Sequence, residues 1–314
     1  MGFPHGIPEW SGIIPRPPFV GTQTMLEQTV VNFVPTGMIP TKAMTPHVPV
    51  HADEIVASVR AAYELGISMV HLHAREPDSG RPTLAADIYA EIIAGIREFA
   101  PTLVICVSLS GRECPDAEIR SAPLRLQGAV KPDMASLTLS SLNFNRLASI
   151  NPPETIQLLA TRMNEAGIMP EFEAFDAGMI NYARYLAKKG LVRPPYYFNL
   201  ILGNIACAQA DLLHTGVMLR DLPEDSIWSL GGIGDSQLPM NAIAIAAGGG
   251  VRVGLEDALH FDRSRRSLAT NLDLLRRVHA LAAIHDRPVM PPEDLRRLLK
   301  LEDGRGRYGR KATA

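Results

Sequence analysis

Residues 69–74 read MVHLHA, and this alternation is the clearest structural signal in the chain. Successive side chains of a strand point to opposite faces, so the apolar members share one face, and Met69, His71 and His73 share the other. The pattern predicts a buried strand over residues 68–74 with one apolar and one functional face.

Seven other short apolar runs have the same character, and each run is followed by a stretch with helix signals. Residues 53–65 end at Gly66, for example, and residues 153–166 end at Gly167, which is the usual C-terminal signal of a helix. With residues 68–74, the expected strands cover residues 29–36, 104–110, 134–142, 170–175, 197–202, 227–231 and 251–256. Eight β–α units without a linker predict one α/β domain, a single (β/α)8 TIM barrel over residues 28–302.

A doubly wound open sheet is the competing fold. It is disfavoured because no Gly-rich dinucleotide fingerprint follows the first expected strand, and the chain contains no P-loop.

Polar residues fall on one face of nearly every expected strand, where a purely structural barrel would carry Val, Ile and Leu. They include Asn32, Ser108, Ser136, Thr138, Glu171, Glu173, Asn199, Ser229 and Arg252. Burying so many polar groups without partners would cost roughly 1–3 kcal/mol each. We therefore expect a polar site at the C-terminal mouth, where barrels of this kind carry out chemistry.

The composition narrows the class of protein. Of the 314 residues, 31 are Lys or Arg and 33 are Asp or Glu, a balance that argues against nucleic-acid binding. No apolar run is long enough to span a membrane, and no signal peptide is evident. Three cysteines without a CxxC pair predict reduced thiols in a cytoplasmic protein.

Both ends differ from the body of the chain. Residues 1–27 contain scattered Pro, Gly and aromatic residues and predict an extended N-terminal arm. Residues 303–314 are Gly-rich and basic, and we expect a flexible, solvated tail there.

His71 and His73 lie two residues apart on one strand face, so both imidazoles can reach one metal ion. Glu256, at the end of the last expected strand, is the best third ligand. Three ligands with an open position are the pattern of a catalytic zinc. The alternative is a pair of hydrogen-bonded core histidines.

Asp257 follows Glu256, and strand geometry predicts that the two side chains point to opposite faces. A carboxylate held by Arg252 near a metal-polarised carbonyl can remove an adjacent proton. The alternative is an ordinary Arg–carboxylate pair that ends the strand.

Ser108 and Gly111 end the third expected strand, where hydroxyl and backbone N–H groups suit a substrate carboxylate. The same residues also suit a simple turn.

These residues together resemble the β-keto acid cleavage enzyme family. The matching stretches are VNFVPTGMIPTK (31–42), PVHADEIVASVRAAYELGISMVHLHARE (49–76), VSLSGR (107–112), MASLTLSSLNF (134–144), MPEFEAFDAGMI (169–180) and SIWSLGGIGDSQLPMNAIAIAAGGGVRVGLED (226–257).

The resemblance implies a zinc-dependent (β/α)8 barrel, commonly a homotetramer, that exchanges an acyl group between a β-keto acid and acetyl-CoA. The products are acetoacetate and a new acyl-CoA. It implies that His71, His73 and Glu256 hold zinc, and that Asp257 and Arg252 form the proton-abstracting dyad. It also implies that the keto-acid carboxylate is bound by Ser108, by Gly111 and by a hydroxyl from Ser136 or Thr138.

Three positions depart from the family pattern. Ile39 stands where the aminohexanoate-cleaving member has a Glu that pairs with the substrate ammonium, which predicts an apolar or neutral substrate tail. Asp235 stands where family members often have a basic residue after GIG, and Ala258 stands where they usually have an Asn after VGLED, so the family's thioester contacts are not expected to carry over unchanged at these positions.

A metal hydrolase of the amidohydrolase type is the rival enzyme. That family places its HxH motif on the first strand and needs histidines on strands five and six, which this sequence lacks. A non-catalytic binding barrel is a second rival.

Overall fold

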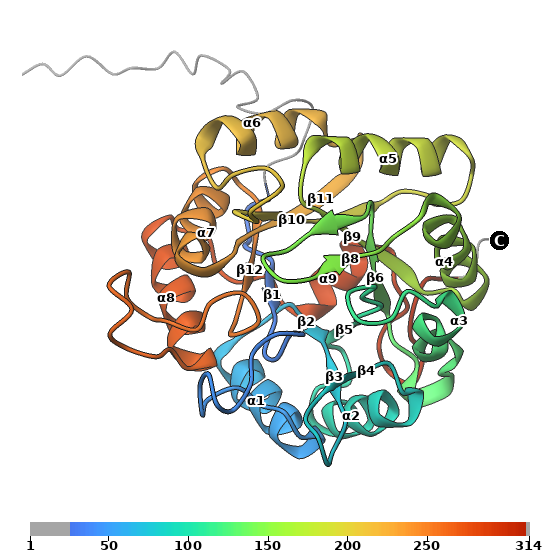
Figure 1. Cartoon of the computed structure of the whole chain (residues 1–314), viewed down its shortest axis with the longest axis horizontal. Helices are drawn as coiled ribbons and strands as arrows, with labels where there is room; N and C mark the ends of the chain where they lie inside the picture. The colour runs from blue at the N-terminus through green and yellow to red at the C-terminus, as the bar shows by residue number, and fades with distance from the viewer. Residues whose placement is uncertain (1–25, 312–314) are drawn as a thin grey trace, which may run out of the picture.

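Eight parallel strands form a closed barrel in the computed structural model, which describes residues 26–311 (Figure 1). The order around the barrel is β1-β12-β11-β10-β9-β6-β5-β2. The barrel strands are β1 (Val31–Phe33), β2 (Met69–Leu72), β5 (Val104–Val107), β6 (Met134–Thr138), β9 (Met169–Ala174), β10 (Tyr196–Leu202), β11 (Ser226–Gly232) and β12 (Gly250–Val253). All eight expected strands are present, so the predicted (β/α)8 TIM barrel is confirmed.

An α-helix follows each barrel strand, and these helices form a ring around the barrel (Figure 1). The helices are α1 (Ala52–Leu65), α2 (Ala86–Phe99), α3 (Ala117–Arg120), α4 (Pro153–Ala166), α5 (Ala177–Lys188), α6 (Leu212–Asp221), α7 (Gln237–Ala246) and α8 (Asn271–Ile284). Short 3₁₀ turns occur at η1 (Ala122–Arg125), η2 (Gly128–Val130) and η3 (Gly234–Ser236). A ninth helix, α9 (Pro292–Leu298), lies behind the barrel in Figure 1.

Two small hairpins lie in the loops that follow barrel strands. One pairs β3 (Ala74–Arg75) with β4 (Pro82–Thr83), and the other pairs β7 (Leu142–Asn143) with β8 (Ala148–Ser149). Each hairpin consists of two strands of two residues. The first hairpin follows β2, and the second follows β6.

The barrel interior is divided into an apolar lower part and a polar upper part. The lower part is filled by a buried cluster that includes Met69, Val104, Met134, Met169 and Tyr197, and residues of α9 pack against it. The polar residues predicted for the inner face lie above this cluster and bond to one another. Among the described residues, this cluster fills the lower interior, so the polar residues face the C-terminal mouth, where barrels of this kind bind their ligands.

The expectation of a solvated C-terminal tail is wrong for residues 303–311. Tyr308 is buried, and the Arg97 guanidinium lies 3.8 Å from the centre of its ring. The Gly309 N–H donates to Asp133 Oδ1 at 3.0 Å, and Arg310 donates to the carbonyl oxygens of Arg193 and Pro195. These contacts fix the segment against the body of the protein, which composition alone could not reveal. The predicted arm lies outside the described residues except for Leu26 and Glu27.

Asp133 is the centre of this floor. Its carboxylate is fully buried and accepts hydrogen bonds from Arg97 and Arg296, with N–O distances of 2.7 to 2.9 Å, and from the N–H of Ile105. Burial raises the pKa of Asp133, but the two guanidinium charges outweigh that effect and hold the pKa below its ordinary value.

Asp133→Asn should lower the free energy of unfolding by about 3–5 kcal/mol, because it leaves two buried guanidinium groups without their carboxylate. Urea unfolding measures this loss. Since the folded pKa lies below the unfolded value, the wild-type contribution is complete above the unfolded pKa and is lost as the pH falls through the folded pKa. Asp235→Asn is the matched control, because its pair with Arg265 is exposed and should contribute less than about 1 kcal/mol. Equal losses in the two variants would contradict the prediction.

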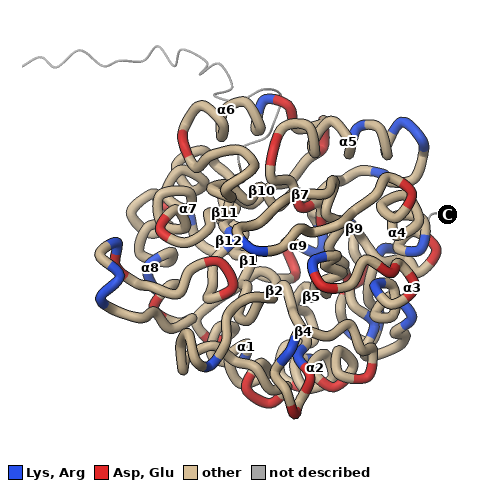
Figure 2. The backbone as a smooth tube through the Cα atoms, in the orientation of Figure 1, with Lys and Arg blue, Asp and Glu red and all other residues tan. Residues whose placement is uncertain are grey.

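Charges of both signs are interspersed over the outside of the barrel (Figure 2). None of the helices in the described part of the chain has the length and apolar character needed to cross a membrane.

Candidate active site

Three ligand-type side chains meet at the barrel mouth. His71 and His73 come from the end of β2, and Glu256 comes from the turn after β12. His73 Nε2 lies 3.3 Å from His71 Nε2 and 3.2 Å from Glu256 Oε1. Ligand atoms on a tetrahedral zinc, each about 2.0–2.1 Å from the ion, lie about 3.3 Å apart. These two separations match this spacing, and the ligand atoms of all three residues lie within 4.8 Å of one another.

Two further observations show that these residues fit a cation. Glu256 Oε2 is buried and has no hydrogen-bond partner among residues 26–311. Two imidazoles and a carboxylate are also the donor set of many catalytic zinc sites. The three side chains can therefore hold a metal ion with an open position.

Glu171 fixes the orientation of His71. His71 Nδ1 lies 2.5 Å from Glu171 Oε2, and both side chains are fully buried. The same carboxylate accepts hydrogen bonds from the amides of Asn32 and Asn199 at 2.8 and 2.7 Å. Because an ionised carboxylate only accepts, Nδ1 carries the hydrogen and Nε2 faces His73. This is the support that metal-bound histidines usually have.

The two histidines have opposite pKa shifts. Burial lowers the pKa of His71, but the charge and hydrogen bond of Glu171 and the charge of Glu256 together outweigh burial and raise the pKa to about 9. Burial dominates at His73, lowering its pKa to about 4 despite the nearby Glu256. His73 is therefore neutral near pH 7, the form that binds a metal.

The turn after β12 corrects one sequence expectation. The last strand ends at Val253 rather than at residue 256, and residues 255–257 form a turn in which the Asp257 N–H donates to the Gly254 carbonyl. Gly254 has a φ of +155°, and a Cβ there would lie 2.1 Å from the Val34 carbonyl oxygen. The expected alternation of Glu256 and Asp257 across a strand is wrong, because neither residue is in a strand.

Arg252 joins the two carboxylates. Its Nη2 donates to Glu256 Oε1 at 2.6 Å, and its Nε donates to Asp257 Oδ2 at 2.8 Å. Burial raises the pKa of Glu256, but the charges of Arg252 and His73 hold it well below its ordinary value. Burial also raises the pKa of Asp257, and there Arg252 does not fully offset it. Asp257 is thus the more basic carboxylate of the pair.

The expected substrate-binding residues lie on the same side of the barrel. Ser108 is buried, and its Oγ accepts the Ser110 N–H at 3.3 Å. Ser136 Oγ accepts the Leu109 N–H at 3.0 Å, whereas the Thr138 hydroxyl donates to Glu173 at 2.7 Å. The Ser136 hydroxyl supports the backbone beside Ser108, and Thr138 is tied to a second site carboxylate.

Gly111 is required by close packing. A Cβ at this position would lie 2.6 Å from the Ile150 carbonyl oxygen and 2.7 Å from Arg120 Nη1. Its own carbonyl oxygen accepts the Ile150 N–H. The loop that carries Gly111 is therefore held against the β7–β8 hairpin.

Sequence reasoning missed the roles of Glu171 and Arg112. Alternation placed Glu171 on the inner face of its strand but could not identify His71 as its partner across the barrel. Arg112 follows Gly111, and its guanidinium carbon lies 3.6 Å from the centre of the Phe144 ring. The sequence SGR (110–112) shows that an arginine follows the glycine, but only the fold places the Phe144 ring against its guanidinium.

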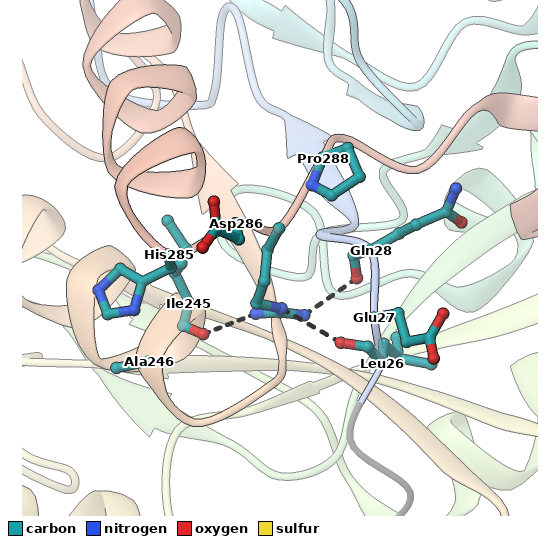
Figure 3. Close-up of a pocket in the computed structure, with 9 residues that line it drawn as sticks. Leu26, Glu27, Gln28, Ile245, Ala246, His285, Asp286 and Pro288 are labelled. Atoms are coloured by element: carbon teal, nitrogen blue, oxygen red, sulfur yellow. Dashed lines mark hydrogen bonds between the residues drawn. The ribbon is translucent and has the colours of Figure 1, made fainter. Parts of the chain in front are cut away.

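A pocket of about 680 Å³ lies at the other end of the barrel (Figure 3). Arg287 lines it and donates to the backbone carbonyls of Leu26, Gln28 and Ile245. His285 and Asp286 also line it. Because Arg287 is used to join backbone segments of the barrel floor, this pocket does not compete with the mouth as the candidate active site.

The fold and the residues at the mouth define a class: a (β/α)8 barrel in which two histidines and a glutamate converge beside an arginine–carboxylate pair. The family model described as beta-keto acid cleavage enzyme matches residues 28–301. The chain belongs to this family.

Two curated relatives illustrate the range of the family. The 3-keto-5-aminohexanoate cleavage enzyme of Fusobacterium nucleatum is 34% identical over 280 residues, which cover 88% of this chain and 100% of the relative. The 3-oxoadipate:acetyl-CoA acetyltransferase of Cupriavidus necator is 36% identical over 284 residues, which cover 88% and 96%.

The apo structure of ObcA has a similar fold, with a TM-score of 0.71 at 19% identity. The match covers 81% of this chain and 65% of ObcA, so this chain spans just under two thirds of that longer protein. At this identity the likeness concerns the fold alone.

The amidohydrolase alternative is not favoured. The HxH motif lies at the end of the second barrel strand, with His71 in β2 and His73 one residue beyond it, and β9 and β10 contain no histidine. The family match points to carbon–carbon bond chemistry instead.

Proposed function

We propose that this protein is a zinc-dependent β-keto acid cleavage enzyme that exchanges an acyl group between a β-keto acid and acetyl-CoA. The observation that carries the proposal is the convergence of His71, His73 and Glu256 beside the Asp257–Arg252 pair. Several curated relatives bear names of this reaction type, among them 3-oxoadipate:acetyl-CoA acetyltransferase.

His71, His73 and Glu256 would hold the zinc, and Glu171 would keep His71 oriented toward it. When bound, zinc supplies Lewis-acid polarisation of the keto-acid carbonyl. Ser108 and Gly111, with Ser136 or Thr138, would bind the carboxylate of the acid.

Asp257 would remove a proton from the carbon between the keto and carboxylate groups, while Arg252 orients its carboxylate. The resulting carbanion attacks the thioester carbonyl of acetyl-CoA and displaces the CoA thiolate. The thiolate then attacks the original keto carbonyl, and the carbon–carbon bond breaks. Asp257 returns its proton to the carbon of the departing acetoacetate, so atoms and charge balance and a new acyl-CoA is formed.

Zinc analysis of the purified protein, combined with an acetoacetate assay on a panel of β-keto acids, tests the proposal. We expect about one zinc per chain and turnover that requires both co-substrates. Hydrolysis of amides or esters without acetoacetate formation would overturn it. The cytoplasmic location and the homotetramer implied by the resemblance stay predictions.

Ile39 leads to a prediction about the substrate tail. It lies in the loop between β1 and α1 and is 46% exposed, so a substrate ammonium beside it would lack a counter-charge but keep some water. A β-keto acid with an amino group should therefore have a kcat/KM roughly five- to tenfold below that of a neutral acid of equal length.

Ile39→Glu should reverse this preference, and Met44→Glu is the matched control because Met44 lies in the same loop with 45% exposure. If 3-keto-5-aminohexanoate is the best wild-type substrate, the inference from Ile39 is wrong. Glu173 would then be the candidate partner, since Glu171 already binds His71.

A further inference from the structure

Most arginines around the mouth are used by the protein itself. Arg75, Arg120 and Arg252 are buried, and their guanidinium groups donate to protein acceptors. The acceptors are the carbonyls of Gly37, Pro40 and Gly80 for Arg75, the carbonyls of Leu109 and Ile150 and the side chain of Asn151 for Arg120, and Glu256 and Asp257 for Arg252.

Arg112 differs from these three residues. Within residues 26–311 its guanidinium makes neither a hydrogen bond nor an ion pair, and its buried Nε has no acceptor. Its packing partner is instead the face of Phe144, at 3.6 Å from the ring centre. A partly buried guanidinium without an acceptor is costly, and the structure retains it at the mouth.

The platform beneath Arg112 is well fixed. Phe144 follows β7 and packs edge-on against Phe175, with ring centres 5.7 Å apart. The adjoining Asn143 carbonyl accepts a hydrogen bond from the Asn204 side chain at 2.9 Å. The guanidinium is thus held in place by stacking, while the N–H groups at its edge stay available for an acceptor.

Arg112 is a positive group close to several carboxylates of the site. Burial lowers the pKa of Arg112, and the carboxylates of Glu256, Glu173 and Asp257 act in the opposite direction, so Arg112 lies within the field of the site. These carboxylates repel an anionic substrate. A cation beside Gly111, next to the expected carboxylate-binding loop, offsets this repulsion.

We propose that Arg112 binds the carboxylate of the β-keto acid through its edge N–H groups and thereby makes the site selective for acids over their esters. This inference rests on the function proposed above, because it identifies the recognition group for one of the two substrates. The guanidinium fork suits bidentate binding of a carboxylate.

Steady-state kinetics of Arg112→Gln, with the two substrates varied separately, test the proposal. We expect the KM for the β-keto acid to rise roughly 10- to 100-fold, with the KM for acetyl-CoA within about twofold of wild type. Arg112→Lys should recover part of the loss, since it keeps the charge but not the fork. Arg146→Gln is the matched control, because Arg146 is exposed in the β7–β8 connection, close in sequence to Phe144. This variant should behave like wild type.

Calorimetric binding of acetoacetate provides a readout without turnover. Weaker acetoacetate binding by Arg112→Gln supports the inference even if the wild type catalyses no acyl exchange, in which case only the proposed function fails. Wild-type turnover together with an unchanged KM in Arg112→Gln overturns the inference alone. A rise confined to the KM for acetyl-CoA also overturns it and assigns Arg112 to the phosphates of CoA.

Discussion

Asp257→Asn is expected to lower turnover by roughly 10²–10⁴ while zinc content and substrate binding stay near wild-type values. The amide keeps the size of the side chain and can still contact Arg252, but it cannot accept a proton from carbon. Burial raises the pKa of Asp257, which strengthens it as a base relative to Glu256. Single-turnover kinetics and metal analysis of the same preparation measure the two effects separately.

Glu256→Gln is the natural comparison, since both carboxylates accept hydrogen bonds from Arg252. This variant should weaken zinc binding itself, because an amide oxygen is a poorer ligand than a carboxylate. Loss of zinc from Asp257→Asn, together with normal turnover of Glu256→Gln, would reverse the two assignments.

His73→Ala and His71→Ala are each expected to remove most of the bound zinc and to lower turnover at least about 100-fold. Either change leaves two ligands where three converged. His71→Ala also removes the imidazole that pairs with the buried Glu171 carboxylate and should destabilise the fold, so His73→Ala is the cleaner test. Metal analysis after dialysis and circular dichroism separate the loss of metal from the loss of structure.

His214→Ala serves as the control, because the His214 side chain on α6 is 44% exposed and, among residues 26–311, its ring pairs with Asp211 rather than with a site residue. It should retain full zinc content and activity. Full zinc occupancy in both His73→Ala and His71→Ala would remove these residues from the metal site.

The barrel was predictable because its signals are local. Each strand and helix has its own periodicity, and the parallel barrel follows from their regular alternation. The inner faces were predictable for the same reason: Asn32, Glu171 and Arg252 all lie inside, as their positions in the alternation predict. The two hairpins were missed because strands of two residues carry no periodic signal.

Parts of the site depend on non-local geometry that the sequence does not reveal. His71 and Glu171 lie on strands β2 and β9, which are not neighbours in the barrel, so their contact follows only from its closure. The turn at Glu256 was missed because Gly254 ends the strand through its close approach to Val34, whereas the apolar pattern continues to Leu255. Arg112 was overlooked because its interest lies in the absence of a protein acceptor for its guanidinium among residues 26–311, which only the structure reveals.

The barrel floor has a consequence for folding during synthesis on the ribosome. Asp133 lies 163 residues before Arg296 and 176 residues before Gly309, two of the groups that neutralise or bond its carboxylate. At about 5–20 residues per second, roughly 9–35 s of synthesis separate Asp133 from Gly309. Barrel strands β6, β9, β10, β11 and β12 are all made during that interval, while the Asp133 carboxylate in the floor is still incompletely paired. The native floor can therefore form only after α9 and residues 299–309 have been made. Its formation is a late step of folding, and chaperones can engage the chain until then.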